Sequence, residues 1–188
     1  MSSMHVAQPI TADEYLALDL EEQRTELIDG AIVVNEPRLP HALLCMRLIR
    51  ALDDWIRTGA DRGLVTVPID VRIDDRNVYA PDLLWYSAAR APAPDAPWPY
   101  PLPDLAIEIR SPSTWRHDVG AKKSAYEREG LPELWLVDGD AGVLLVFRRS
   151  APQAPSFDVA LELDRSATLR STLLPGFALE VGALFDLG

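Results

Sequence analysis

Residues 104–126 have the sequence DLAIEIRSPSTWRHDVGAKKSAY, which predicts a strand, a turn and a helix in that order. The apolar run at 105–109 is typical of a buried strand, and Ser111-Pro-Ser-Thr114 favours a turn. A helix is expected from about Val119 to Glu129. The strand nevertheless contains a carboxylate, Glu108, and a buried carboxylate without a partner is costly. This stretch therefore predicts a core element with a polar site inside it.

Helices and strands are mixed along the rest of the chain. The expected elements are a capped helix from Thr11 to about Leu18, a hairpin at Asp29-Gly30, a long amphipathic helix from about Pro40 to Thr58, strands Leu64–Ile73 (interrupted near Pro68) and Val78–Tyr86, a proline-rich loop at 91–103, a hairpin around 138–142 and a strand near 157–163. This order predicts an α/β (α+β) fold with a central mixed β-sheet flanked by helices.

The length of 188 residues predicts a single domain, and 48% hydrophobic with 25% charged residues is ordinary globular composition. No apolar run reaches the roughly 18–20 residues of a membrane span. The first residues show no secretory signal, and a single cysteine, Cys45, excludes an internal disulfide. We therefore expect a cytoplasmic protein without a membrane partner.

The formal net charge of −11 limits how the chain can bind nucleic acid. Proteins that coat DNA without sequence preference rely on basic surfaces that contact phosphates. Such a role is therefore disfavoured. A locally basic cleft remains possible, and so does an enzyme that contacts its polymer briefly with help from a divalent metal.

Two acids lie in apolar strand sequences. Asp82 follows Pro81 at the start of a hydrophobic run, and alternation places Glu108 opposite the apolar face of its own strand. On adjacent strands the two carboxylates could converge on one hard cation such as Mg²⁺. Taken singly, each also has a structural interpretation: Asp82 as an acceptor for turn amides and Glu108 in an ion pair with an arginine.

The only two lysines of the chain, Lys122 and Lys123, follow the acidic strand. Spacing of four places Lys122 on one helical stripe with Asp118 and Tyr126, whereas Lys123 pairs at that spacing with Glu127 on a solvated face. Lys122 is thus the inward lysine, suited to contact a phosphate or orient a water. Coding bias toward arginine is the alternative explanation for the rarity of lysine.

Glu26 and His41 are further candidates. Glu26, beside the first hairpin, could add a third carboxylate, although a surface acid is the more common outcome. His41 opens the long helix, where a histidine is more often a cap or a surface residue than a ligand.

Six motifs in this order resemble the Uma-two family, restriction-endonuclease-like proteins of the PD-(D/E)XK nuclease superfamily. The motifs are Glu26-Leu-Ile-Asp-Gly30, His41 before a long helix, Pro81-Asp82, Glu108-x-x-Ser111-Pro-Ser113, Asp118-x-x-x-Lys122-x-x-x-Tyr126 and Pro132-Glu133-Leu-Trp135-x-Val-Asp138. The likeness covers residues from about 11 to 185, including a closing Leu-Pro-Gly-Phe at 174–177.

The resemblance implies a nuclease domain in which Asp82 and Glu108 hold Mg²⁺ (or Mn²⁺), with Glu26 as an auxiliary acid. The superfamily lysine would stand at Arg110, so the resemblance implies that this role has moved to Lys122. The implied reaction is hydrolysis of phosphodiester bonds, most simply of DNA, by an endonuclease.

The resemblance also implies roles around the site. The expected substrate contacts are His41, Arg110, Arg116 and Lys123, and the expected structural residues are Tyr126 and Ser111. A homodimer is expected from the family likeness alone. The alternatives are a catalytically inactive module for nucleic-acid binding or oligomerisation, and a nuclease that acts on RNA or a small nucleotide.

Overall fold

A six-stranded mixed sheet forms the centre of the computed structural model, which describes residues 8–20 and 24–187. Its strand order is β10-β9-β8-β7-β6-β3, and β7 and β8 are parallel while the other pairs are antiparallel. The strands are β3 (Leu64–Thr66), β6 (Leu83–Tyr86), β7 (Leu105–Ile109), β8 (Glu133–Asp138), β9 (Val143–Arg148) and β10 (Val159–Leu163). The predicted mixed sheet is confirmed.

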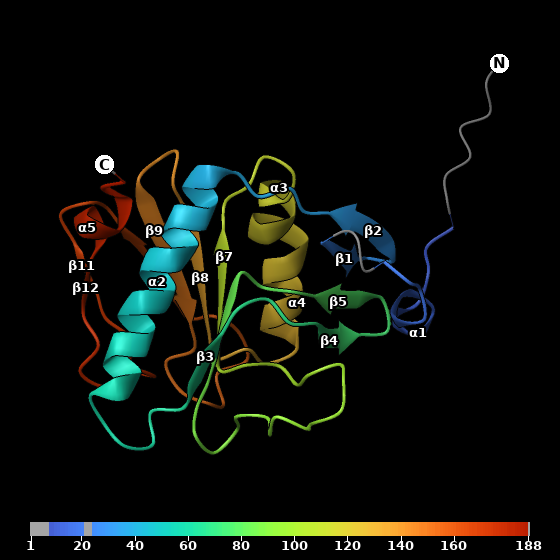
Figure 1. Ribbon diagram of the computed structural model, residues 1–188, viewed down its shortest axis with the longest axis horizontal. Coiled ribbons are helices and arrows are strands. Elements are labelled where there is room, and N and C mark those ends of the chain that lie inside the picture. The colour runs from blue at the N-terminus through green and yellow to red at the C-terminus, as the bar shows by residue number, and fades with distance from the viewer. Residues whose placement is uncertain (1–7, 21–23, 188) are drawn as a thin grey trace.

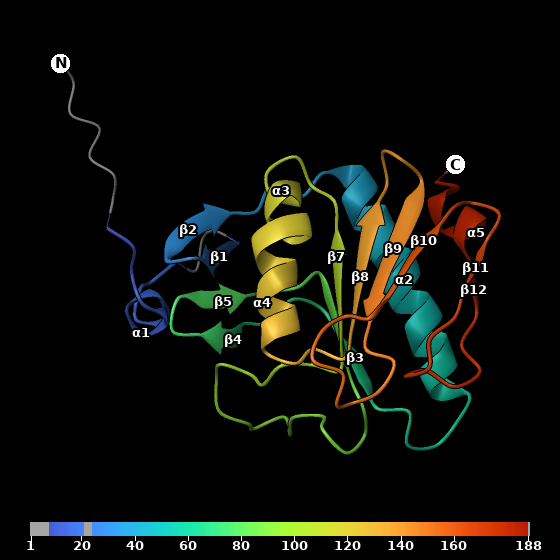
Figure 2. The ribbon, with the colours of Figure 1, turned by 180° about the vertical axis from the view of Figure 1, so that it is seen from behind.

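Helices cover both faces of this sheet. The long helix α2 (Leu39–Arg57) packs on one face through Leu48 and Leu52, which share a core with Leu83 and Ile107. The helix α4 (Lys123–Arg128) lies on the opposite face, as the two opposed views show (Figure 1, Figure 2). Because the sheet is enclosed on both sides, its central strands are apolar on both faces rather than alternating.

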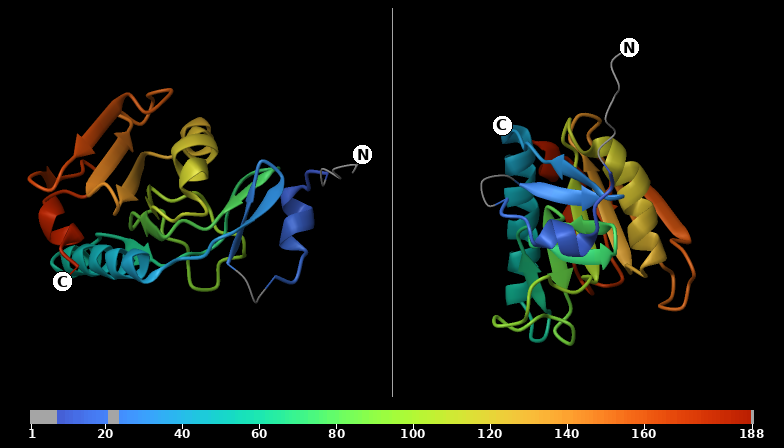
Figure 3. Two further views of the ribbon diagram at one scale, coloured as in Figure 1. Left: turned by 90° about the horizontal axis from the view of Figure 1, so that it is seen from above. Right: turned by 90° about the vertical axis from the view of Figure 1, so that its right-hand side faces the viewer.

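A smaller antiparallel sheet, which the sequence analysis did not predict, lies beside the first (Figure 3). Its order is β2-β1-β5-β4, with β1 (Thr25–Ile28), β2 (Ala31–Val34), β4 (Val71–Asp74) and β5 (Asn77–Tyr79). The helix α1 (Ala12–Leu16) packs on one face of this sheet. A two-stranded sheet, β11 (Thr168–Leu169) with β12 (Leu179–Glu180), and a short helix, α5 (Val181–Phe185), complete the described chain.

Two local predictions are confirmed in detail. Thr11 and Glu14 form a reciprocal capping box at the start of α1, in which the hydroxyl of Thr11 accepts from the backbone of Glu14 at 3.2 Å. Asp29 and Gly30 connect β1 to β2 with φ angles of 51° and 80°. A two-residue hairpin loop with a type I′ turn requires positive φ at both turn positions.

The strand predicted over 78–86 is wrong as one element. It consists of β5 and β6, which belong to different sheets, and the chain crosses between them at Ala80-Pro81-Asp82. Pro81 has no N–H for a strand ladder, and the N–H of Ala80 donates to Glu26 Oε1 at 2.9 Å instead of to a strand. The interruption predicted near Pro68 is confirmed, and there too the two halves, β3 and β4, lie in different sheets.

The helix predicted from Val119 begins earlier. A helical turn, α3 (Trp115–His117), leads into a π-helical segment (Asp118–Lys122) and then into α4. The backbone N–H of Thr114 donates to the hydroxyl of Ser111 at 3.2 Å. Ser111 therefore helps to start the helix, and single π turns of this kind are frequent at functional sites.

Gly63 provides a test of the junction between β3 and β6. Its φ is +80°, and an added Cβ would lie 2.0 Å from the carbonyl oxygen of Tyr86. Gly130 has a similar φ of +85°, and apart from its chain neighbours no atom of the described residues lies within 4 Å of an added Cβ, so Gly130→Ala should cost only the strain of the left-handed backbone, about 1–2 kcal/mol. We expect Gly63→Ala to lower the free energy of unfolding by about 1–3 kcal/mol more than Gly130→Ala does, because β6 must shift away from the added methyl group. Urea unfolding of both variants measures this difference, and equal losses would contradict the contact.

Candidate active site

Lys122 lies buried between three carboxylates that come from different parts of the chain. Its Nζ is 2.8 Å from Glu26 Oε1, 2.7 Å from Glu108 Oε1 and 3.3 Å from Asp118 Oδ1. Glu26 belongs to β1 of the small sheet and Glu108 to β7 of the large one. All four side chains are at most 5% exposed. We call these four residues the carboxylate–lysine cluster.

Neighbouring groups orient the cluster. The hydroxyl of Tyr126 donates to Glu108 Oε1 at 2.8 Å, and its ring packs edge-on against Tyr79 with centroids 5.3 Å apart. The hydroxyl of Thr114 donates to Asp118 Oδ2 at 3.0 Å. The predicted stripe of Asp118, Lys122 and Tyr126 therefore faces the sheet, and Tyr126 supports Glu108 from within the core.

Asp82 lies at the first position before β6, beside this cluster. In the antiparallel register Leu83 pairs with Ile107, and continuing that register by one residue sets Asp82 opposite Glu108. Its Oδ2 accepts from the backbone N–H of Ile109 at 2.8 Å and lies 3.0 Å from His41 Nε2. His41, at the start of α2, is therefore a buried partner of Asp82.

Burial and charge determine the protonation of the cluster. Burial raises the pKa of Glu108 well above its ordinary value, although Lys122 opposes this effect. Burial by itself would lower the pKa of Lys122, but Glu108, Glu26 and Asp118 together raise it well above its ordinary value. Lys122 thus remains charged, while the excess of carboxylates makes full ionisation of the cluster costly.

The protonation of Asp118 should make the stability of the protein depend on pH. Burial raises the pKa of Asp118 from 3.8 to about 6, and a difference of this size is worth about 3 kcal/mol. Since the folded state holds the proton more tightly, this carboxyl contributes stability below about pH 4 that is lost as the pH rises through about 6. Asp118→Asn should therefore reduce the loss of stability between pH 4 and pH 8 by about 3 kcal/mol.

Urea unfolding of the Asp118→Asn variant at the two pH values measures this change. Asp158→Asn is the control, because hydrogen bonds from Ser150 lower the pKa of that exposed carboxyl and its removal should alter the pH slope in the opposite direction. An unchanged pH dependence in Asp118→Asn would contradict the assignment.

The acids also suit a divalent cation by their chemistry. Asp82 Oδ1 is buried without a hydrogen bond from residues 8–20 or 24–187, and its nearest cation there is Arg24 Nη2 at 3.5 Å. Within the same described ranges no three His, Cys, Asp or Glu side chains form a metal-binding group. Mg²⁺ commonly takes one or two carboxylates and fills its other positions with water and phosphate, so a pair such as Asp82 and Glu108 is a chemically adequate donor set.

The two arginines that were expected to contact the substrate have different surroundings. Arg110 is held by Asp138 at 2.7 Å and Asp140 at 3.4 Å, so it is partly neutralised. Arg116 is exposed, and its Nε contacts the ring of His117 at 3.2 Å.

Lys123 departs from its predicted surroundings. Its Nζ lies over the rings of Phe147 and Phe157, with centroids 4.7 and 5.7 Å away, and Glu127 instead accepts from the backbone of Phe157 at 2.8 Å. The predicted Lys123–Glu127 pair is wrong for the described chain, because packing on the aromatic pair replaces it.

Sequence reasoning missed two members of the site. Asp118 was recognised only as a position on the stripe, although its spacing of four from Lys122 is the signal of a third carboxylate partner. Arg24 precedes β1 and reaches Asp82 Oδ1 from the small sheet. No local pattern marks Arg24, since the contact depends on how the two sheets meet.

The mixed sheet between α2 and α4, with buried acids on adjoining strands, defines a restriction-endonuclease-like protein. Residues 12–182 match the Uma2 family, described as "Putative restriction endonuclease", and the chain belongs to this family. The crystal structure of a nuclease of the family DUF820 from Anabaena variabilis ATCC 29413, itself called putative, is similar in fold. The two share 22% identity with a TM-score of 0.79, over 95% of this chain and 99% of that one. No curated protein matches the chain.

Proposed function

We propose that the protein is a metal-dependent endonuclease that hydrolyses phosphodiester bonds of DNA. The observation that carries this proposal is the charge imbalance of the site. Three buried carboxylates, from Glu26, Glu108 and Asp118, surround one buried lysine, and a fourth, Asp82, lies opposite Glu108 just before the adjoining strand β6. Such an excess of buried negative charge calls for a further cation. The family description and the nuclease from Anabaena variabilis support the same class of reaction.

Asp82 and Glu108 are the residues that would hold Mg²⁺ or Mn²⁺. When bound, the metal would lower the pKa of a water and neutralise charge on the phosphate. His41 and the N–H of Ile109 orient Asp82 through its Oδ2, and Oδ1 accepts no hydrogen bond from the described part of the chain. Tyr126 orients Glu108 through a donated hydrogen bond of 2.8 Å.

Lys122 is the catalytic cation of the proposal. Its ammonium group would stabilise the negative charge that develops on the attacking oxygen or on the phosphate. Glu26 and Asp118 hold the side chain in place from two directions. Because a hydrogen bond to a fixed donor costs no reorganisation during the reaction, this preorganisation favours the transition state.

Exposed arginines are the expected contacts of the DNA backbone. Arg24, whose side chain is 42% exposed, stands directly beside Asp82, and Arg116 lies on the helical turn before the cluster. His41 is buried against Asp82, so in this proposal it positions a carboxylate rather than contacts DNA. The net charge of −11 predicts weak binding, and the few arginine contacts predict a modest dependence on salt.

The proposal is tested by incubating plasmid and single-stranded DNA with the purified protein and Mg²⁺ or Mn²⁺. We expect products that appear only with one of these metals and disappear when EDTA is added. A folded protein that leaves every substrate intact under all conditions, at protein concentrations above that of the DNA, would overturn the assignment.

A specific observation favours a second candidate, a catalytically inactive nuclease-fold module. Lys122 already contacts three of the four acids, an arrangement that holds together without a metal. Thermal unfolding separates the two candidates, because a ligand that binds the folded state raises the Tm. If the protein is a metal-dependent enzyme, Mg²⁺ should raise the Tm of the native protein but not that of Asp82→Ala. If it is an inactive module, Mg²⁺ should leave both Tm values unchanged.

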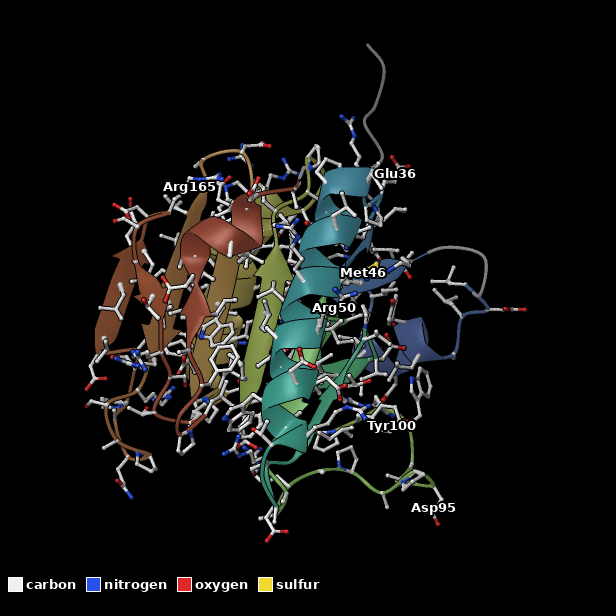
Figure 4. All side chains as sticks on the ribbon, turned by 60° about the vertical axis from the view of Figure 1, so that its left-hand side comes forward. Glu36, Met46, Arg50, Asp95, Tyr100 and Arg165 are labelled. Atoms are coloured by element: carbon white, nitrogen blue, oxygen red, sulfur yellow. The ribbon has the colours of Figure 1, made fainter. Side chains whose placement is uncertain are left out.

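A homodimer is part of the proposal. Leu39 and Met46 on α2 are 72% and 59% exposed, and Figure 4 labels Met46 along this helix. Because single exposed apolar side chains are normal on protein surfaces, the homodimer rests on the family resemblance. Light scattering after gel filtration measures the mass of the particle, and a mass of 20.8 kDa would contradict the dimer. No helix in the described chain is both long and apolar enough to cross a membrane, and a cytoplasmic location stays a prediction.

A further inference from the structure

A pocket of about 730 Å³ lies next to the carboxylate–lysine cluster. The end of α1 and the loop after it, the start of β1, the segment before β4 and the proline-rich loop supply its walls. The residues that matter for its chemistry are Tyr15, Arg24, Glu26, Asn35, Asp70 and Trp98. Its volume is within the range of sites that bind small organic molecules.

Two residues connect the pocket to the proposed reaction centre. Glu26 lines the pocket, and its Oε1 contacts Lys122 Nζ at 2.8 Å. Arg24 also lines the pocket, and its Nη2 is 3.5 Å from Asp82 Oδ1. A group bound in the pocket would therefore lie beside Glu26 and Arg24, which contact Lys122 and Asp82 respectively.

The proline-rich loop brings an aromatic side chain, Trp98, to the pocket. Trp98 is 51% exposed, and its Nε1 donates to Asp70 Oδ2 at 3.0 Å, which holds the indole at the rim. The backbone N–H of Tyr100 donates to the carbonyl of Asp70 at 2.9 Å and ties the same loop to the segment before β4. Tyr100 and Asp95 mark this loop in Figure 4.

Several hydrogen-bond acceptors are among the residues that line the pocket. Asn35 Oδ1 is buried and accepts no hydrogen bond from the described residues, and the carboxylates of Glu26 and Asp70 are acceptors when ionised. A well-matched occupant therefore offers N–H donors and a flat ring for Trp98. A purely aliphatic occupant would leave Asn35 Oδ1 without a donor, at a cost.

We propose that this pocket receives one unpaired nucleobase that carries an exocyclic amino group, from the strand next to the cleaved bond. This inference rests on the proposed nuclease function and adds a substrate class to it. The base stacks on Trp98 and donates to the acceptors, while Arg24 contacts the adjoining phosphate. A base inside a duplex cannot enter, because its amino group and its faces are already occupied. The protein should thus prefer single-stranded DNA, and cytosine or adenine over thymine.

The test measures binding without cleavage. Fluorescently labelled 12-residue oligo(dC), oligo(dT) and a duplex of the same length are titrated with the full chain in EDTA, and anisotropy gives each Kd. We expect oligo(dC) to bind at least about fivefold more tightly than either alternative. Trp98→Leu, which keeps bulk but removes the aromatic face, should weaken oligo(dC) binding by at least about fivefold, because stacking on an aromatic side chain is the main sequence-tolerant contribution to such binding.

Trp98→Phe is the matched variant, because it keeps an aromatic face, and it should stay within about threefold of the native Kd. Thermal unfolding of both variants checks that the fold persists. Equal binding of oligo(dC) by the native protein and by Trp98→Leu would contradict the proposed nucleobase site. Equal affinity of the native protein for duplex and single-stranded DNA would contradict it as well. Metal-dependent cleavage of plasmid is scored separately, so the pocket can fail while the proposed nuclease function stands.

Discussion

Asp82→Asn should lower the rate of Mg²⁺-dependent DNA cleavage by about 100- to 1,000-fold, because a metal-bound site contributes several kcal/mol to the transition state. Asparagine preserves the volume of the side chain and an oxygen that can accept from Ile109 N–H, as Asp82 Oδ2 now does at 2.8 Å. The negative charge and the second carboxylate oxygen are lost. The fold should therefore persist while the affinity for the metal falls.

Asp104→Asn is the matched control for this variant. Asp104 is also a buried acid, it precedes β7 at the end remote from Glu108, and it accepts from Arg90 Nη1 at 2.5 Å and from the backbone of Ser87 at 2.8 Å. We expect its cleavage rate to stay within about threefold of native. Initial rates on plasmid, measured over a range of Mg²⁺ concentrations, compare the two. Similar cleavage rates for Asp82→Asn and Asp104→Asn would contradict the proposed role of Asp82 in holding the metal.

Lys122→Met should lower the free energy of unfolding by about 3–5 kcal/mol at pH 7 and abolish cleavage. Removing one partner of a buried charge set leaves the others uncompensated, and here Glu26, Glu108 and Asp118 would remain together without a counter-charge. Protonation relieves that repulsion, so the loss should be smaller at pH 5 than at pH 8. The stability of the variant therefore falls as the pH rises.

The neighbouring lysine supplies the control. Lys123→Met alters a half-buried ammonium group above Phe147, 4.7 Å from the ring centroid, and an interaction of this kind is worth about 0.5–1 kcal/mol. Urea unfolding of both variants at pH 5 and pH 8 measures the four free energies. If both substitutions lower the free energy of unfolding equally, Lys122 contributes no more to stability than Lys123, and its role as the counter-charge of the three carboxylates is wrong.

The order and type of most elements could be predicted because they depend on neighbouring residues. The capping box at Thr11, the hairpin at Asp29-Gly30 and the long helix starting near Pro40 rest on side chains within a few positions of one another. The buried strand at 105–109 follows from its composition. Such signals are local, so a sequence displays them directly.

The division into two sheets could not be predicted in the same way. Pro81 signals a break in a strand, but whether the chain then continues in the same sheet depends on which strands are available to pair. The early start of the helix before Lys122 has a similar cause. Ser111 donates and accepts within its own turn, and only the folded chain shows that this turn is helical.

The candidate residues Glu26, Asp82, Glu108 and Lys122 were identifiable by type and position, because acids in apolar strands and rare lysines are conspicuous. Their partners were not. Glu26 and Lys122 are 96 positions apart, and His41 and Asp82 are 41 apart. Pairing over such separations is determined by how sheets and helices pack, and it carries no local pattern.

The local pattern of residues was enough to place Glu108 in a core strand and Lys122 on the inward stripe of the helix that follows. The contacts of Lys122 with three carboxylates and of Asp82 with His41 depend instead on how distant segments pack. The physical reason is the cost of burying charge: each of these groups is stable only where an opposite charge or a donor is brought to it. That arrangement is produced where the two sheets, α2 and the π-helical segment Asp118–Lys122 meet.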